Sequence, residues 1–210
     1  MFLNSHKEYI TREMGKKYAI SRFTDKDNFL ISYFAPIKKV RIEQDGSLWL
    51  VYWQGNDKLK KIPVEMKYGK TVNKNGINIR MTENSLNAND GCVIEGIMNL
   101  EENPGLYFEC LGDKSAYMAV NKNAEISYYI VSETGNTPDI SFLPEKYKVQ
   151  SDRQFGKTVQ FRVLLKKHVM EIYFDDIYMS SYSLPGDSTG KAGLTGTENS
   201  VTAIKSWNVY

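Results

Sequence analysis

The stretch Thr158–Phe174 reads TVQFRVLLKKHVMEIYF, and it decides the fold class of this 210-residue chain. Apolar and polar side chains alternate along it, which is the period-two pattern of a strand with one buried face. If the turn is Lys166-Lys167, the stretch is predicted to fold into a hairpin in which Arg162 lies opposite Glu171. One face is then predicted to be a core face, and it carries Val159, Phe161, Val163, Met170, Ile172 and Phe174.

The other face of this hairpin is polar, and it carries Gln160, Arg162, Glu171 and Tyr173. In this register Gln160 lies opposite Tyr173. The cross-strand pair of Arg162 and Glu171 would stabilise the hairpin by less than about 1 kcal/mol. Lys-Lys is a poor sequence for a tight turn, so the register stays open by one residue, and that shift would exchange the two faces.

Short strand-like runs separated by Gly, Pro, Asn and Asp continue in both directions from this hairpin. An Asp45-Gly46 turn predicts a second hairpin, because Asp-Gly tolerates the positive φ that tight turns demand. Helical periodicity is limited to Glu8–Lys17 and Asn84–Asn89. The predicted strands are Val40–Ile42, Ser47–Trp53, Ile77–Met81, Val93–Leu100, Gly105–Leu111, Ala116–Val120, Glu125–Val131, Thr158–Leu165, His168–Phe174, Tyr178–Leu184, Ala192–Thr195 and Val201–Val209.

About 12 to 16 strands with almost no helix favour an antiparallel β-sandwich or a barrel. No repeat of about 40 to 50 residues recurs, which disfavours a propeller. No linker-like stretch divides the chain. We therefore predict an N-terminal lead-in over residues 1–30 and one all-β, two-sheet sandwich domain over residues 31–210.

The composition excludes several classes of function. The chain has 27 Lys and Arg against 25 Asp and Glu, a formal charge of +2, so no nucleic-acid partner is expected. No apolar run is long enough for a membrane span or a signal peptide, which predicts a cytoplasmic protein unless the chain is an excised piece of a larger one. With only two His and two Cys, a His-rich metal centre and a disulfide framework are excluded. Cys92 and Cys110 are predicted to be reduced, buried thiols.

The last third of the chain resembles the end of the concanavalin-like β-sandwich, a jelly roll. Four pieces carry the resemblance: Phe161-Arg162-Val163, Glu171–Asp175, Gly190–Leu194 and Ser206–Val209. Upstream, Tyr33–Val40 and Asp45–Leu50 resemble the junction that follows the propeller in bacterial glycoside hydrolase family 32 enzymes. Those enzymes act on β-fructosides, and their C-terminal sandwich is related to fructan-binding modules of carbohydrate-binding family 66.

The sequence also departs from that family. The propeller's catalytic motifs are absent, and Glu109-Cys110 copies the letters of the acid/base dipeptide in the wrong segment. No strand carries acidic residues at alternate positions, so no catalytic residue is predicted. A glycosidase whose carboxylates come from separate strands stays open as an alternative. Asp175-Asp176 stands where the family usually has Asp-Gly, which leaves the geometry of that turn open.

The resemblance implies a non-catalytic, carbohydrate-binding or accessory domain of a glycoside hydrolase, with a fructan-type glycan as its partner. Sugars offer apolar faces to Tyr rings and hydroxyl groups to Arg, Asp and Glu. The predicted binding residues are those of the polar hairpin face, Gln160, Arg162, Glu171 and Tyr173, joined by Glu95 and Arg80 from neighbouring strands.

A second reading is purely structural. The sandwich would pack against a missing catalytic propeller, and it would expose an apolar docking patch that includes Tyr33, Phe34, Trp49 and Trp53. No cofactor is expected on either reading. Sandwiches of this family often hold a structural calcium ion, but the sequence has no Asp-rich loop of the density that such a site needs.

Overall fold

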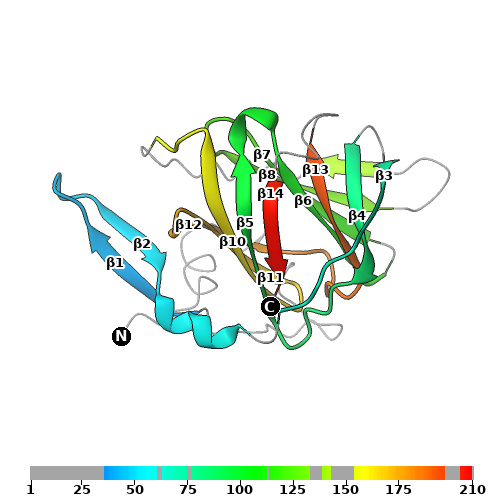
Figure 1. Cartoon of the computed structure of the whole chain (residues 1–210), viewed down its shortest axis with the longest axis horizontal. Coiled ribbons are helices and arrows are strands. Elements are labelled where there is room, and N and C mark those ends of the chain that lie inside the picture. Colours follow the sequence, from blue (N-terminus) through cyan, green and yellow to red (C-terminus); the bar gives the residue numbers. More distant parts are fainter. Residues whose placement is uncertain are drawn as a thin grey trace. The chain divides into compact units, whose positions relative to one another are not determined.

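The computed structural model describes residues 36–60, 63–74, 77–112, 114–132, 139–142, 154–196 and 204–209 (Figure 1). The chain divides into two units between Asp57 and Lys58, which is further along than the predicted lead-in boundary at residue 30. Within the described ranges, no helix has the length and apolar character needed to cross a membrane.

The first unit contains a hairpin of β1 (Lys38–Ile42) and β2 (Leu48–Tyr52). Its connection spans Glu43–Ser47, and Gly46 alone in this loop has a positive φ, of 84°. The Glu43 N–H donates to the Ser47 carbonyl, and the Gly46 N–H donates to the Glu43 carbonyl, both at 3.0 Å. The predicted hairpin is therefore present, but with a longer loop than the two-residue Asp-Gly turn.

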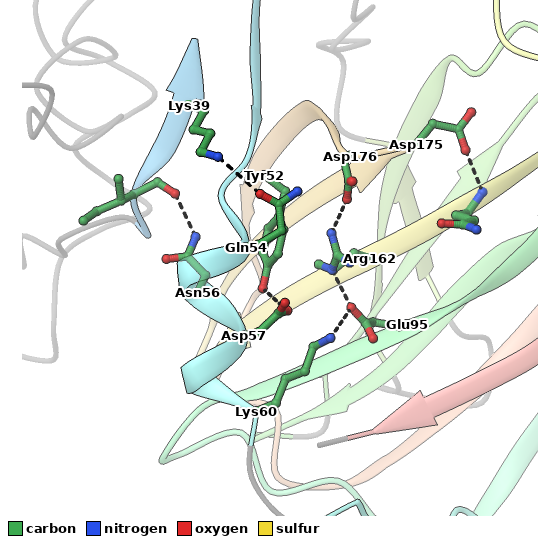
Figure 2. Close-up of polar contacts among 12 residues, drawn as sticks. Lys39, Tyr52, Gln54, Asn56, Asp57, Lys60, Glu95, Arg162, Asp175 and Asp176 are labelled. Atoms are coloured by element: carbon green, nitrogen blue, oxygen red, sulfur yellow. Dashed lines mark hydrogen bonds and ion pairs between the residues drawn. The ribbon is translucent and has the colours of Figure 1, made fainter. Parts of the chain in front are cut away.

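Side chains tie this hairpin to the following 3-10 helix η1 (Gln54–Leu59), inside which the boundary between the units falls. The Asn56 side-chain amide donates to the Ile37 carbonyl at 2.7 Å. The Tyr52 hydroxyl donates to the Asp57 carboxylate at 3.1 Å (Figure 2). These bonds satisfy polar groups at the base of the hairpin and fix where the chain leaves it.

The second unit is a sandwich of two antiparallel sheets. The strands that this unit contributes to the first sheet follow the order β12-β11-β10-β5-β14. The second sheet has the order β3-β4-β13-β6-β7-β8-β9. The strands of the first sheet are β5 (Cys92–Asn99), β10 (Thr158–Lys166), β11 (Val169–Phe174), β12 (Ile177–Ser183) and β14 (Ile204–Val209). Those of the second are β3 (Tyr68–Lys74), β4 (Ile77–Ser85), β6 (Gly105–Cys110), β7 (Lys114–Val120), β8 (Ile126–Ser132), β9 (Asp139–Phe142) and β13 (Lys191–Gly196). This confirms the predicted all-β, two-sheet sandwich.

The two sheets meet through tightly packed inner faces. Tyr128 of β8 stacks on Tyr182 of β12 with ring centroids 4.0 Å apart and planes 2° apart. The Tyr128 and Ser180 hydroxyls hydrogen-bond at 2.5 Å, so one side chain joins the sheets by packing and by a polar contact. The predicted core face of the β10–β11 hairpin is confirmed, because all six of its residues are buried: Val159, Phe161, Val163, Met170, Ile172 and Phe174.

The predicted register of the β10–β11 hairpin is wrong by two residues. Lys166 pairs with Val169, so the turn is Lys167-His168, and Arg162 lies opposite Tyr173 rather than Glu171. Lys167 takes the positive φ that the turn needs, at 54°. Moving a turn by one residue shifts every cross-strand partner by two, and this is why the polar and apolar faces were nevertheless assigned correctly.

Some elements differ from the expected ones. The strands β3 and β9 were not predicted, and Asn84–Asn89 forms no helix. The sequence of β3, YGKTVNK, has no apolar alternation because this strand lies at the end of its sheet and most of its side chains are exposed. A short 3-10 helix, η2 (Leu100–Glu102), follows β5 and is capped by the Asn99 side chain.

Cys92 and Cys110 are not joined in a disulfide, in agreement with the prediction of two reduced thiols. Cys92 is buried and Cys110 is half-buried at the end of β6. Burial raises the pKa of the Cys110 thiol to about 12, and hydrogen bonds to the Gly186 and Ala116 backbone oppose that rise only in part. The Cys110 thiol is thus held in its protonated, unreactive form at neutral pH.

We expect Tyr128→Phe to lower the free energy of unfolding by about 1 to 3 kcal/mol, because it leaves the buried Ser180 hydroxyl without its partner. Adding Ser180→Ala should recover part of this loss, since both members of the pair are then apolar. Urea denaturation of the single and double variants measures both effects. A Tyr128→Phe protein as stable as the wild type would show that this hydroxyl pair does not help to join the sheets.

Candidate functional site

The outer face of the first sheet carries the polar side chains of its central strands. Phe161 and Val163 point into the core, so the intervening Arg162 points away from the second sheet. Strand β10 is paired on both sides, and Arg162 lies between Glu95 of β5 and Tyr173 of β11. The pattern that buries the apolar residues of β10 therefore also places Arg162 at the centre of this face.

Four charged side chains form a connected row on this face, which we call the charged row: Lys60, Glu95, Arg162 and Asp176. Arg162 Nε donates to Glu95 Oε1 at 2.5 Å, and its Nη1 donates to the Asp176 carboxylate. Lys60 Nζ contacts the same Glu95 oxygen at 2.9 Å (Figure 2). Two cations and two carboxylates thus alternate along the row, and their formal charges balance.

The row is neither buried nor fully solvated. The side chains of Lys60, Glu95 and Arg162 are 22, 19 and 20% exposed, whereas that of Asp176 is 45% exposed. Burial by itself lowers the pKa of Arg162, but the hydrogen bonds to Glu95 and Asp176 outweigh it and leave this pKa raised. The guanidinium is consequently a permanent cation in a fixed position.

The turn between β11 and β12 holds Asp176 in place. Asp175 and Asp176 form this two-residue turn with φ values of 47° and 65°, between the paired residues Phe174 and Ile177. Positive φ at both central residues matches a type I′ hairpin turn. The Asp175 N–H donates to the Gln160 carbonyl, and Asp175 Oδ1 accepts from the Gln160 N–H, each at 2.9 Å. Two bonds thus anchor the turn to β10, and Figure 2 shows the one that the Asp175 side chain accepts.

Glu171 and Tyr173, both predicted to bind a ligand, are buried instead. Tyr173 has an exposure of 0% and Glu171 of 4%, and the Tyr173 hydroxyl donates to Glu171 Oε2 at 2.7 Å. The Tyr173 ring packs edge-on against Tyr178, whose hydroxyl bonds Ser181 at 2.8 Å. Burial is the main reason that the pKa of Tyr178 is raised. In this arrangement the two residues support the sheet beside Arg162, and Tyr173 offers no ring face for stacking.

The remaining predicted residues fall in different places. Gln160 has an exposed side chain near the start of β10, and its backbone serves the β11–β12 turn. Arg80 lies on β4 of the other sheet, where its guanidinium sits 5.0 Å from the centre of the Tyr68 ring. The structure therefore brings Arg162 and Glu95 together directly, keeps Glu171, Tyr173 and Gln160 on the same strand pair, and places Arg80 elsewhere.

Sequence reasoning missed Lys60 and Asp176. Lys60 belongs to a lysine-rich segment, Lys58–Lys61, that is typical of a solvated surface. The sequence could have singled out Asp176, because it stands where the family that the chain resembles usually has Gly. A polar residue in a backbone conformation suited to glycine is a reason to ask what its side chain contacts.

The charged row suits binding better than hydrolysis. Glycoside hydrolysis uses two carboxyl groups with the sugar between them, one of which must donate a proton. Here Glu95 and Asp176 both accept hydrogen bonds from the one guanidinium that lies between them. Among the described residues, no three His, Cys, Asp or Glu side chains gather into a possible metal site.

No family model and no curated protein matches the sequence. Among solved structures, the chain is similar to the carbohydrate-binding module CBM66 from Bacillus subtilis, at 12% identity and a TM-score of 0.41, over 70% of this chain and 88% of the module. It is also similar to a toad ovary galectin in complex with thio-digalactose, at 12% identity and a TM-score of 0.40, over 62% of this chain and 96% of the galectin.

A third similar structure is sucrose-6-phosphate hydrolase from Lactobacillus gasseri, at 11% identity and a TM-score of 0.45. It is matched over 83% of this chain but only 36% of the hydrolase. None of the three TM-scores reaches 0.5.

We expect a double-mutant cycle of Glu95→Ala and Arg162→Ala to give a coupling energy of about 0.5 to 3 kcal/mol, since the two side chains are hydrogen-bonded and largely shielded from water. The cycle of Glu101→Ala and Lys157→Ala is a matched control. That pair has the same charges at 2.9 Å, but its side chains are 52 and 78% exposed, so water and salt should screen it and its coupling should be smaller. Equal coupling in the two cycles would contradict a fixed, shielded Arg162.

Proposed function

We propose that this chain is a non-catalytic carbohydrate-binding domain whose ligand contacts the charged row. One observation carries the proposal: the guanidinium of Arg162 is fixed between the carboxylates of Glu95 and Asp176 on the outer face of a rigid sheet. Charged groups held in place by one another provide hydrogen-bond donors and acceptors at set positions.

Sugar hydroxyl groups fit such a row, because each hydroxyl can donate to a carboxylate and accept from a cation. Asp176 is the most exposed carboxylate of the row and Arg162 is its central donor. Since these side chains are already ordered by their mutual bonds, a ligand loses less free energy in fixing them on binding.

The balance of charge in the row favours a neutral glycan. Lys60 and Arg162 each contact a carboxylate, so the row carries no formal charge excess to attract a sulfated or uronic acid polymer. The preference for a fructan-type glycan, and the placement of the domain as an accessory to a glycoside hydrolase, follow from the sequence resemblance to family 66 and family 32 proteins.

Isothermal titration calorimetry against inulin, levan and a panel of neutral oligosaccharides tests this function. We expect at least one of these glycans to bind the wild type with a Kd between about 1 µM and 1 mM. Arg162→Met should weaken binding at least tenfold, because the central donor is lost while the volume of the side chain is retained. Lys157→Met is the matched control, and it should bind as the wild type does.

Two outcomes would contradict the proposal. If no glycan in a broad array binds the wild type, the chain is not a carbohydrate-binding domain. If Arg162→Met and Lys157→Met weaken binding equally while both keep the wild-type circular dichroism spectrum, the ligand contacts a surface other than the charged row.

The second candidate function is docking to a catalytic partner, and the β1–β2 hairpin is the observation that favours it. Four apolar side chains share one face of this hairpin as two cross-strand pairs, Val40 with Leu50 and Ile42 with Leu48. They are between 45 and 70% exposed. Trp49 and Trp53 of the predicted patch are half-buried, and Tyr33 and Phe34 lie outside the described residues.

An exposed apolar face of this kind should cause the isolated chain to self-associate, because burying the face removes it from water. We expect the mass measured by sedimentation velocity to rise with protein concentration. The Ile42→Lys/Leu48→Glu double variant should stay monomeric, since it replaces an apolar pair by a cross-strand ion pair. Leu111→Lys, at another exposed site, should behave as the wild type does. A wild type that is monomeric at every concentration would argue against docking by this face.

A further inference from the structure

We infer that Asp176 is a ligand-contacting residue that determines specificity, at a turn position that glycine would suit better, and that Asp175 positions it. This inference rests on the proposed carbohydrate-binding function, and it names two residues that the sequence prediction did not include. Its evidence is the backbone conformation of the turn, the place of the Asp176 carboxylate and the anchoring of the turn to β10.

The backbone of this turn is unusual for the residues that form it. Non-glycine residues with positive φ are few among the described residues, and only Asp175 and Asp176 are consecutive: Asn103, Ala124, Lys167, Asp175 and Asp176. A type I′ turn favours Asn-Gly or Asp-Gly, with glycine second. Asp tolerates the left-handed region better than most residues, but less well than glycine. The second position of the turn is therefore occupied at a cost in conformational energy.

Folding stability does not account for this cost. The side chain of Asp176 is 45% exposed, and ion pairs that open to water contribute little to stability. What the carboxylate does provide is a hydrogen-bond acceptor at the exposed end of the charged row, in direct contact with the central guanidinium. Backbone strain of this kind collects where a side chain is needed for binding.

Asp175 acts through Asp176 and not on the ligand. Its side chain accepts from the Gln160 N–H and its backbone N–H donates to the Gln160 carbonyl, so both of its contacts hold the turn against β10. Strand β10 also carries Arg162, two residues beyond Gln160. The two hydrogen bonds between Asp175 and Gln160 therefore hold the Asp176 carboxylate and the Arg162 guanidinium relative to the same strand.

The geometry indicates how a glycan would be selected. A pair of neighbouring hydroxyls can address Asp176 and Arg162 together, with one hydroxyl donating to the carboxylate and the other accepting from the guanidinium. A sugar that lacks one hydroxyl of the pair leaves a charged group without its partner, and such a mismatch is strongly disfavoured. Asp176 thus selects for an adjacent diol.

The test compares Asp176→Gly with Lys167→Gly, using the glycan that binds the wild type in the titrations described above. Lys167 is a matched control, because it takes φ 54° in the neighbouring two-residue turn of β10–β11 and is exposed. Both variants should raise the Tm by a few degrees, since glycine relieves the turn. Only Asp176→Gly should weaken glycan binding, by about tenfold or more.

The role of Asp175 is tested by Asp175→Ala and its conservative counterpart Asp175→Asn. Asp175→Ala removes the acceptor for the Gln160 N–H, and it should raise the Kd and shift the Arg162 Nε–H resonance in NMR spectra. Asp175→Asn keeps an acceptor oxygen and tolerates positive φ, so it should restore both the Kd and the resonance. A purely structural role would lower the Tm of Asp175→Ala without moving the Arg162 resonance.

The outcomes separate this inference from the proposed function. If the wild type binds no glycan, the proposed function fails and the inference fails with it. If Arg162→Met loses binding while Asp176→Gly keeps it, only the inference is overturned. It is also overturned if Asp176→Gly has a lower Tm than the wild type, because the carboxylate would then be kept for stability.

Discussion

The burial of the two inner sheet faces against each other is the constraint on which the site depends. Strand β10 is paired on both sides, so its apolar residues can be shielded only by pointing at the second sheet. Once Phe161 and Val163 point inward, the pleat directs Arg162 outward. The same register then places it between Glu95 and Tyr173. The core and the charged row are thus two consequences of one alternating pattern.

Turns provide the second level of control, because each one sets which residues become neighbours across a hairpin. The Lys167-His168 turn gives Arg162 its partner Tyr173. The Asp175-Asp176 turn carries a carboxylate to the guanidinium from outside the pleated region of the sheet. The charged row therefore combines a side chain that the sheet holds with one that a hairpin turn holds.

Polar residues on this face divide into those that support the sheet and those that remain accessible. Glu171 and Tyr173 are hydrogen-bonded to each other beneath the surface. Arg162 and Asp176 contact each other where the sheet face borders on water. Residue type does not separate the two groups, since an acid occurs in each of them. The difference lies in how deeply the surrounding chain buries each position. The alternation of apolar and polar residues along a strand does not indicate that depth of burial.

The local pattern of residues predicts the sandwich class, the inner face of the β10–β11 hairpin and the outward direction of Arg162, because these follow from alternation and turn signals. The sequence also shows that Asp175-Asp176 replaces the Asp-Gly turn expected at this position. Long-range contacts, in contrast, place Arg80 on the other sheet, bury Tyr173, and bring Lys60 and Asp176 to Glu95 and Arg162. Such contacts join residues far apart along the chain, and they depend on strand order and on exact turn lengths. Moving a turn by one residue changes every cross-strand partner while leaving the local pattern unchanged.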